Sequence, residues 1–178
     1  GSWTSMDLGP SPLIIETIHV DPSNDDIYAG CMWYNGGGIY YSRNDGDSWE
    51  PRNEGLKGVR VWKVATSQAN GTIFAGTYYS GIFRSRDMGI SWEPLGNGMP
   101  EQQSSFVRGL AVHQSGTVFS GSGGGGIHRS LNDGDDWMRI DGGTGYRHVG
   151  ALAIREDGFV FFGESDTDGG IFMSSNEG

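Results

Sequence analysis

The apolar residues of this chain fall in short runs bounded by glycine, and two kinds of run recur along the sequence. The first kind mixes β-branched and aromatic residues, as in Gly-Thr-Ile-Phe-Ala-Gly, and its copies lie at 26–30, 71–76, 116–121 and 158–163. The second kind begins with Gly-Ile, and its copies lie at 38–42, 81–85, 126–130 and 170–174. Such runs are typical of β-strands, and no stretch has a sustained helical period. The pattern therefore predicts an all-β chain.

An eight-residue motif, S-x-[DN]-x-G-x-x-W, begins at the end of each run of the second kind. We name this motif the Ser–Trp turn. Its serines are Ser42, Ser85, Ser130 and Ser174, so the repeat is 43 to 45 residues long. A period of about 40–50 residues with four short strands per unit is the signature of a β-propeller. We therefore expect four-stranded antiparallel blades, four per chain.

The residue types of the Ser–Trp turn suit a folding role rather than catalysis. Asp or Asn accepts hydrogen bonds from backbone N–H groups of its own turn, and glycine supplies a positive φ. The serine helps to fix the turn, and the indole packs between blades. The turn residues are Ser42, Asn44, Gly46 and Trp49, then Ser85, Asp87, Gly89 and Trp92, then Ser130, Asn132, Gly134 and Trp137, then Ser174, Asn176 and Gly178, with Trp3 as the fourth tryptophan.

The repeat divides residues 1–178 into one set of blades. The predicted blades are 12–52, 59–95, 105–140 and 147–174, and residues 3–8 are the fourth strand of the last blade. Within the second blade the predicted strands are 60–66, 72–77, 81–86 and 91–95.

The Ser–Trp turns resemble the Asp-box repeat of bacterial neuraminidases over essentially the whole chain. In texture the repeats are most similar to bacterial proteins described as photosystem-assembly or stability-factor-like. The resemblance implies a β-propeller and an extracellular or periplasmic location. It does not imply an activity, because many activities share this scaffold. Sialidase activity is disfavoured, since the sequence has no F/Y-R-I-P segment and Arg60 and Arg147 do not align with Arg108.

The two ends of the sequence complement each other. Trp3 aligns with the tryptophans that precede the other fourth strands, and the motif that begins at Ser174 reaches Gly178. Exchange of a fourth strand between the ends would hide the edge strands of a propeller. The sequence leaves open a four-bladed monomer, an eight-bladed ring made by a homodimer, and a piece of a longer propeller. We favour the homodimer, whose symmetry satisfies both ends.

The charge balance excludes several partners. The chain has 178 residues and a formal net charge of −10, with 12 scattered basic residues. Nucleic acids and anionic membranes require clustered Lys and Arg, so neither is expected as a partner. The sequence shows no signal peptide and no run of the roughly 20 apolar residues that a membrane helix needs. Cys31 stands alone and is expected to be a small buried apolar residue.

The loops opposite the Ser–Trp turns vary far more than the strands, which makes that face the candidate binding surface. Aligned first strands place Glu16, Trp62, Arg108 and Gly150 at one position near the propeller axis. Aromatic rings beside polar groups suit a carbohydrate or a peptide. The candidate ligand-binding residues are Trp33, Tyr34, Trp62, Tyr78, Tyr79, Arg108, Glu164, Asp166 and Asp168. The competing interpretation is that the aromatic residues only cover the tops of the blades.

Glu164, Asp166 and Asp168 form the densest acidic cluster. Paired carboxylates could cleave a glycoside, but the sequence supplies no second acid across a groove, so no catalytic residue is assigned. The same run partly matches a calcium loop, although Ser175 stands where a bidentate Glu is needed. The histidines lack metal-ligand spacing, so no metal or other cofactor is expected.

These features predict a non-catalytic propeller that serves as a scaffold or interaction module, with a protein, a glycan or a second copy of the chain as its partner. The alternative is a carbohydrate-binding or glycoside-hydrolysing propeller that uses the same loop face.

Overall fold

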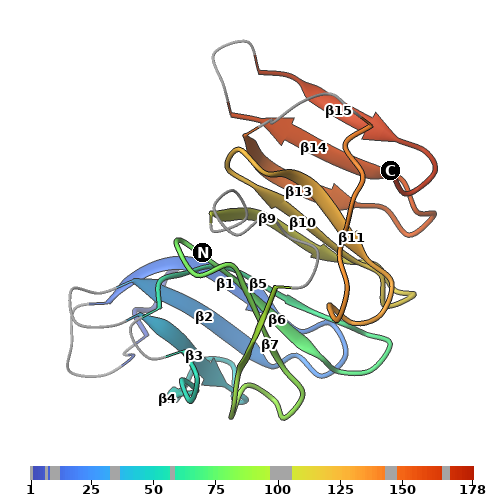
Figure 1. Cartoon of the computed structure of the whole chain (residues 1–178). Coiled ribbons are helices and arrows are strands. Elements are labelled where there is room, and N and C mark those ends of the chain that lie inside the picture. The colour runs from blue at the N-terminus through green and yellow to red at the C-terminus, as the bar shows by residue number, and fades with distance from the viewer. Residues whose placement is uncertain are drawn as a thin grey trace.

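The strands of this chain form four separate antiparallel sheets, each built from consecutive strands (Figure 1). The computed structural model describes residues 2–6, 8, 13–32, 37–56, 59–96, 106–142, 148–165 and 169–178. Every described element is a strand, and the sheets follow one another as propeller blades, with blades 1 and 4 at the two ends of the series (Figure 1). The predicted all-β propeller of antiparallel blades is therefore confirmed.

Three blades have four strands, and the fourth blade has three among the described residues. Blade 1 comprises β1 (Ile14–Val20), β2 (Ile27–Met32), β3 (Gly38–Ser42) and β4 (Glu50–Pro51). Blade 2 comprises β5 (Val61–Thr66), β6 (Ile73–Thr77), β7 (Ile82–Ser85) and β8 (Glu93–Leu95). Blade 3 comprises β9 (Val107–Val112), β10 (Val118–Ser122), β11 (Gly126–Ser130) and β12 (Met138–Arg139). Blade 4 comprises β13 (Val149–Ile154), β14 (Val160–Glu164) and β15 (Ile171–Ser174).

Neighbouring blades pack through one repeated contact between a valine and a glycine. The valine is the residue that opens the first strand of a blade, and the glycine lies on the second strand of the blade before it. A methyl group built on Gly76 would lie 2.6 Å from Cγ1 of Val107, and one built on Gly30 would lie 2.9 Å from Cγ1 of Val61. Val149 fills the space above Gly121 in the same way. The missing side chain of each glycine thus makes the space that the next blade occupies.

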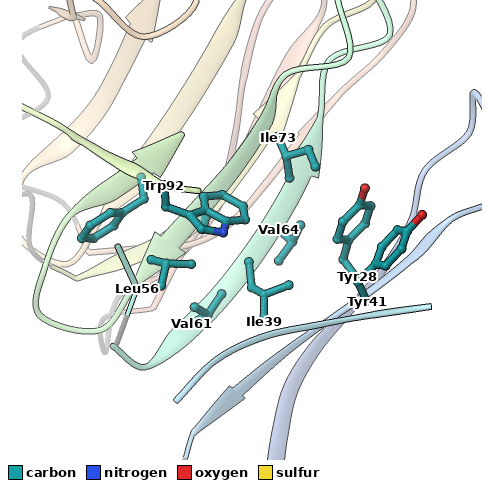
Figure 2. Packing of buried hydrophobic residues seen from close by; sticks show 10 residues of the cluster. Tyr28, Ile39, Tyr41, Leu56, Val61, Val64, Ile73 and Trp92 are labelled. Atoms are coloured by element: carbon teal, nitrogen blue, oxygen red, sulfur yellow. The ribbon is translucent and has the colours of Figure 1, made fainter. Parts of the chain in front are cut away.

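Apolar side chains extend this valine–glycine contact into a core between blades. Figure 2 shows Tyr28 and Ile39 of blade 1 in one cluster with Val61, Val64 and Trp92 of blade 2. A second cluster joins blades 2 and 3, and its members are Ala65, Phe74, Ile82, Val107, Leu110, Val118 and Trp137. Each core therefore belongs to two blades, and one blade alone could not bury its own apolar residues.

The Ser–Trp turns have one recurring hydrogen-bond pattern, seen fully in the third turn. The hydroxyl of Ser130 accepts from the backbone N–H of Gly134 (2.9 Å) and donates to Asn132 Oδ1 (3.0 Å). The indole N–H of Trp137 donates to the carbonyl of Gly134 (3.0 Å). Gly134 has φ 87°, and Asp133 before it has φ 60°. The side chains thus fix a turn with two successive left-handed residues, a conformation that costs least at glycine and at Asn or Asp.

The N-terminal segment forms no strand in the described residues 2–6 and 8, although the sequence predicts residues 3–8 as the fourth strand of blade 4. Instead Met6 lies against Gly46, in the Ser–Trp turn of blade 1. Within a single chain the segment therefore stands beside blade 1 rather than beside β15.

We predict that Gly121→Ala destabilises the protein, because the added methyl group would overlap Cγ1 of Val149. Overpacking of this kind lowers the free energy of unfolding by about 1–3 kcal/mol. Denaturant unfolding at equilibrium measures the change.

Gly96→Ala is the matched control, since no atom of the described residues lies within 4 Å of the added methyl group at this exposed position. Equal stabilities for the two variants would contradict the role given to the valine–glycine contact.

Candidate functional site

An open cavity of about 350 Å³ lies where the first strands of all four blades converge, and its lining residues are Glu16, Trp62, Lys63, Arg108 and Gly150. The first strands contact one another in series, β1 with β5, β5 with β9 and β9 with β13. The four residues that the aligned sequence places at one position thus come together around a single space. We name this space the bulge cavity, for the reason that follows.

Each first strand contains a β-bulge at the same place. In β1, Ile15 pairs with Cys31 and Thr17 pairs with Gly30, so that Glu16 is an extra residue without a partner across the ladder. The same shift leaves out one residue in each of the other first strands, namely Trp62, Arg108 and Gly150. A bulge redirects the side chain of its extra residue. All four bulge residues line the cavity, so the bulges aim the side chains of Glu16, Trp62 and Arg108 at it, and Gly150 lines it without a side chain.

The bulge cavity holds an ion pair beside an aromatic ring. Arg60 donates to Glu16 Oε1 from Nη2 (2.6 Å) and from Nε (3.1 Å). The guanidinium carbons of Arg60 and Arg108 each lie 5.2 Å from the centroid of the Trp62 ring. This distance is within the range of cation–π attraction. Two guanidinium groups thus lie over the Trp62 ring, where a sugar would have to stack.

A cluster of aromatic rings adjoins Trp62. Tyr78 lies with its ring centroid 4.5 Å from that of Trp62 and 5.1 Å from that of Phe106. Tyr79 contacts both Tyr78 and Phe106, yet remains 65% exposed. The pKa of Tyr79 is raised, and the largest cause is a side-chain hydrogen bond with Tyr78. Tyr79 is therefore the aromatic residue of this cluster that presents most surface to a ligand.

Two cations at the bulge cavity have no anionic partner among the described residues. Neither Lys63 nor Arg108 forms an ion pair there, and Nε of Arg108 is buried without a hydrogen-bond acceptor. Glu16 is already bonded to Arg60. A buried donor without an acceptor costs free energy that a ligand can recover. The geometry therefore suits a ligand that brings a carboxylate or another anionic oxygen.

Several predicted site residues lie apart from this cavity or beyond the part of the chain that the structure describes. Trp33, Tyr34, Asp166 and Asp168 fall outside the described residues. Glu164 ends β14, where its backbone N–H donates to Gly170. The predicted acidic cluster, with the glycoside cleavage and the calcium site considered for it, stays a prediction.

Sequence reasoning missed three contributors to the site: Arg60, Lys63 and Phe106. Lys63 directly follows the bulge residue Trp62, and Arg60 lies one position before β5. The signal that could have found Lys63 is its place directly after the aligned position. No pattern in the sequence pairs Arg60 with Glu16, which lies 44 residues away.

The buried ionisable side chains elsewhere have structural surroundings. Burial raises the pKa of the Cys31 thiol to about 11. Burial, and after it the neighbouring Arg139, lowers the pKa of His128. Among the described residues no three His, Cys, Asp or Glu side chains are placed to hold a metal ion. The same described residues contain no helix that is long and apolar enough to cross a membrane.

We predict that Cys31 resists alkylation in the folded protein, because its side chain is fully buried and its thiol stays protonated. A pKa two units above the ordinary value of 9.0 reduces the thiolate at pH 8 by roughly 100-fold. Mass spectrometry after iodoacetamide treatment should show at least this slowing relative to the chain in denaturant. Equal rates in the two states would show that the thiol is reactive.

Comparison with known proteins gives a fold and no family. The sequence matches no protein-family model and no curated protein. Among solved structures, a GH74 xyloglucanase from Xanthomonas campestris superposes with a TM-score of 0.70 and 19% identity over 90% of this chain and 28% of that chain. PorZ, a bacterial surface component of the type-IX secretion system of Porphyromonas gingivalis, gives 0.69 and 15% over 97% of this chain and 26% of that one.

A third similar structure is the computationally designed protein Ika4, with a TM-score of 0.70 and 15% identity over 99% of each chain. This chain spans between a quarter and a third of the length of the two natural proteins, at 26% and 28%. At 15–19% identity these likenesses show the fold alone. They agree with the sheets described above: the chain has a β-propeller fold made of antiparallel blades.

Proposed function

We propose that this chain is a non-catalytic β-propeller interaction module whose bulge cavity binds an acidic side chain of a protein partner. The observation that carries the proposal is the pair of cations, Lys63 and Arg108, that face the cavity without an anionic partner among the described residues. The chain has 12 basic against 22 acidic residues, so two unpaired cations in one cavity stand out locally.

The contacts around Trp62 favour a carboxylate over a neutral sugar. A sugar binds through an open aromatic face, whereas Arg60 and Arg108 both lie against the indole. A guanidinium group binds a carboxylate through two parallel hydrogen bonds. The exposed ring of Tyr79 adds apolar surface beside this position, as protein interfaces commonly do.

We also infer that the four Ser–Trp turns are Asp boxes and that the protein works in the extracellular or periplasmic space. The first inference is supported by the hydrogen bonds of Ser, Asx and Gly that recur in all four turns. In the first three turns the indole N–H of Trp also donates to the carbonyl of Gly. The second is supported by the fold shared with PorZ, which is a bacterial surface component.

Binding of hexaglutamate at low ionic strength tests the ligand class. We predict that Arg108→Gln raises its Kd by roughly 10- to 100-fold, because a charge-assisted hydrogen bond contributes about 1.5–3 kcal/mol. Isothermal titration calorimetry measures this change.

Arg155→Gln is the matched control, since it removes the same charge from an exposed turn where Arg155 pairs with Asp157. An equal loss of affinity for hexaglutamate in both variants would show that only the overall charge of the protein matters. Polygalacturonate and xyloglucan serve as the acidic and the neutral glycan. Tighter binding of either glycan than of hexaglutamate, or cleavage of xyloglucan, would contradict a protein ligand and a non-catalytic role.

A further inference from the structure

Blade 1 and blade 4 each present an apolar sheet surface to solvent. We define the front face as Ile15, Ile18 and Val20 of β1, and the rear face as Gly163, Ile171 and Met173 of blade 4. Ile18 is 66% exposed and Ile171 is 84% exposed. Apolar residues gathered in this way mark a surface that a partner covers.

The positions equivalent to Ile171 are buried in every other blade. Strand pairing places Ile171 opposite Gly163, as it places Ile39, Ile82 and Ile127 opposite the glycines of blades 1 to 3. These three isoleucines are between 0% and 4% exposed. Since a following blade covers each of them, the rear face has the form of a blade surface that lacks its follower.

The front and rear faces carry the two halves of the valine–glycine contact. Ile15 precedes the β-bulge of β1 just as Val61, Val107 and Val149 precede theirs. Those valines are fully buried, whereas Ile15 is 38% exposed. Above Gly163, Cβ of Ala151 in the same blade is the only atom of the described residues within 4 Å of the space for a side chain. Among the described residues, Ile15 has no glycine beneath it, and Gly163 has no β-branched residue above it.

The N-terminal segment already occupies the place of a fourth strand from a preceding blade. In blades 2 and 3, the residue three positions after the tryptophan contacts the glycine of the next Ser–Trp turn: Leu95 contacts Gly134, and Ile140 contacts Gly178. Met6 follows Trp3 by three positions and contacts Gly46 in the same way. Trp3 itself is fully exposed, whereas Trp92 and Trp137 are each 6% exposed. The segment thus stands beside blade 1 where the fourth strand of a neighbouring blade stands in blades 2 and 3.

We propose that the rear face of this chain binds the front face of a second copy, so that two chains close one ring of eight blades. Ile15 of one copy then covers Gly163 of the other, and Trp3 enters the partner's Ser174–Gly178 turn. The strand register of blades 1 to 3 places Thr4 and Ser5 beside β15, whose outer edge is unpaired among the described residues.

A second copy fits this surface because one sequence supplies both sides of every contact. The contact of a β-branched residue with a glycine, the buried isoleucine and the inserted tryptophan each occur inside the chain between consecutive blades. The interface is head to tail, and two such interfaces related by a two-fold axis leave no face unpaired. Closure also removes the unpaired sheet edge.

The solution mass of the 178-residue chain tests the proposal. We expect light scattering after size-exclusion chromatography to give about twice the 19.2 kDa of one chain. A mass of one chain would overturn the proposal. A mass that grows beyond two chains with concentration would show open head-to-tail assembly, and would overturn closure by two copies.

Gly163→Val blocks the proposed contact without disturbing the single chain, because the added side chain has open space and valine suits a strand. We expect this variant to have the mass of one chain. Gly96→Val, which adds the same side chain at an exposed position with no described neighbour within 4 Å, should keep the mass of two. A two-chain mass for Gly163→Val would overturn the assigned contact.

Mixing two variants tests the head-to-tail geometry. Ile15→Asp and Gly163→Val should each have the mass of one chain, since each spoils both interfaces of the ring. A mixed pair keeps one intact interface, in which Ile15 of the Gly163→Val chain meets Gly163 of the Ile15→Asp chain. We expect the mixture to recover the two-chain mass in part. No recovery would contradict a head-to-tail interface.

Discussion

The contact between a β-branched residue and a glycine is the interaction on which the other features of this protein depend. A blade is a thin sheet with two faces, and its apolar residues are buried only when another blade lies close. The glycine on the second strand lets the next first strand come so close that a methyl group built on Gly76 would lie 2.6 Å from Cγ1 of Val107. Interiors are packed to crystal density, so added volume at these glycines has no room. The spacing between blades is set there.

The same first strands that make this contact also build the candidate site. The residue directly after each contacting residue is the extra residue of a β-bulge, as Trp62 is after Val61. One register shift, repeated in each blade, thus divides two tasks between adjacent positions. The first position is β-branched in every blade, and in blades 2 to 4 it packs against a glycine. The second points to the cavity and is free to differ, and it is Glu16, Trp62, Arg108 and Gly150 in turn.

This division explains why the cavity can be electrostatically specialised inside a chain of strong negative charge. Cations that face the axis do not disturb the packing between blades, because packing uses other positions. Arg108 is supported by the Trp62 ring rather than by a carboxylate among the described residues. An uncompensated guanidinium held in this way remains available to an anionic ligand.

The sequence by itself determined the repeat, the strands and the Ser–Trp turns, because these depend on residues close together in the chain. The predicted strands of blade 2 differ from the observed ones by two residues at most. It also aligned four of the five residues that line the bulge cavity. Tertiary structure alone decided which of them are paired, since Arg60 reaches Glu16 only when blades 1 and 2 pack. It also showed that Ile15 and Gly163 lack the contacts their equivalents make, because burial is a property of neighbours that local sequence does not record.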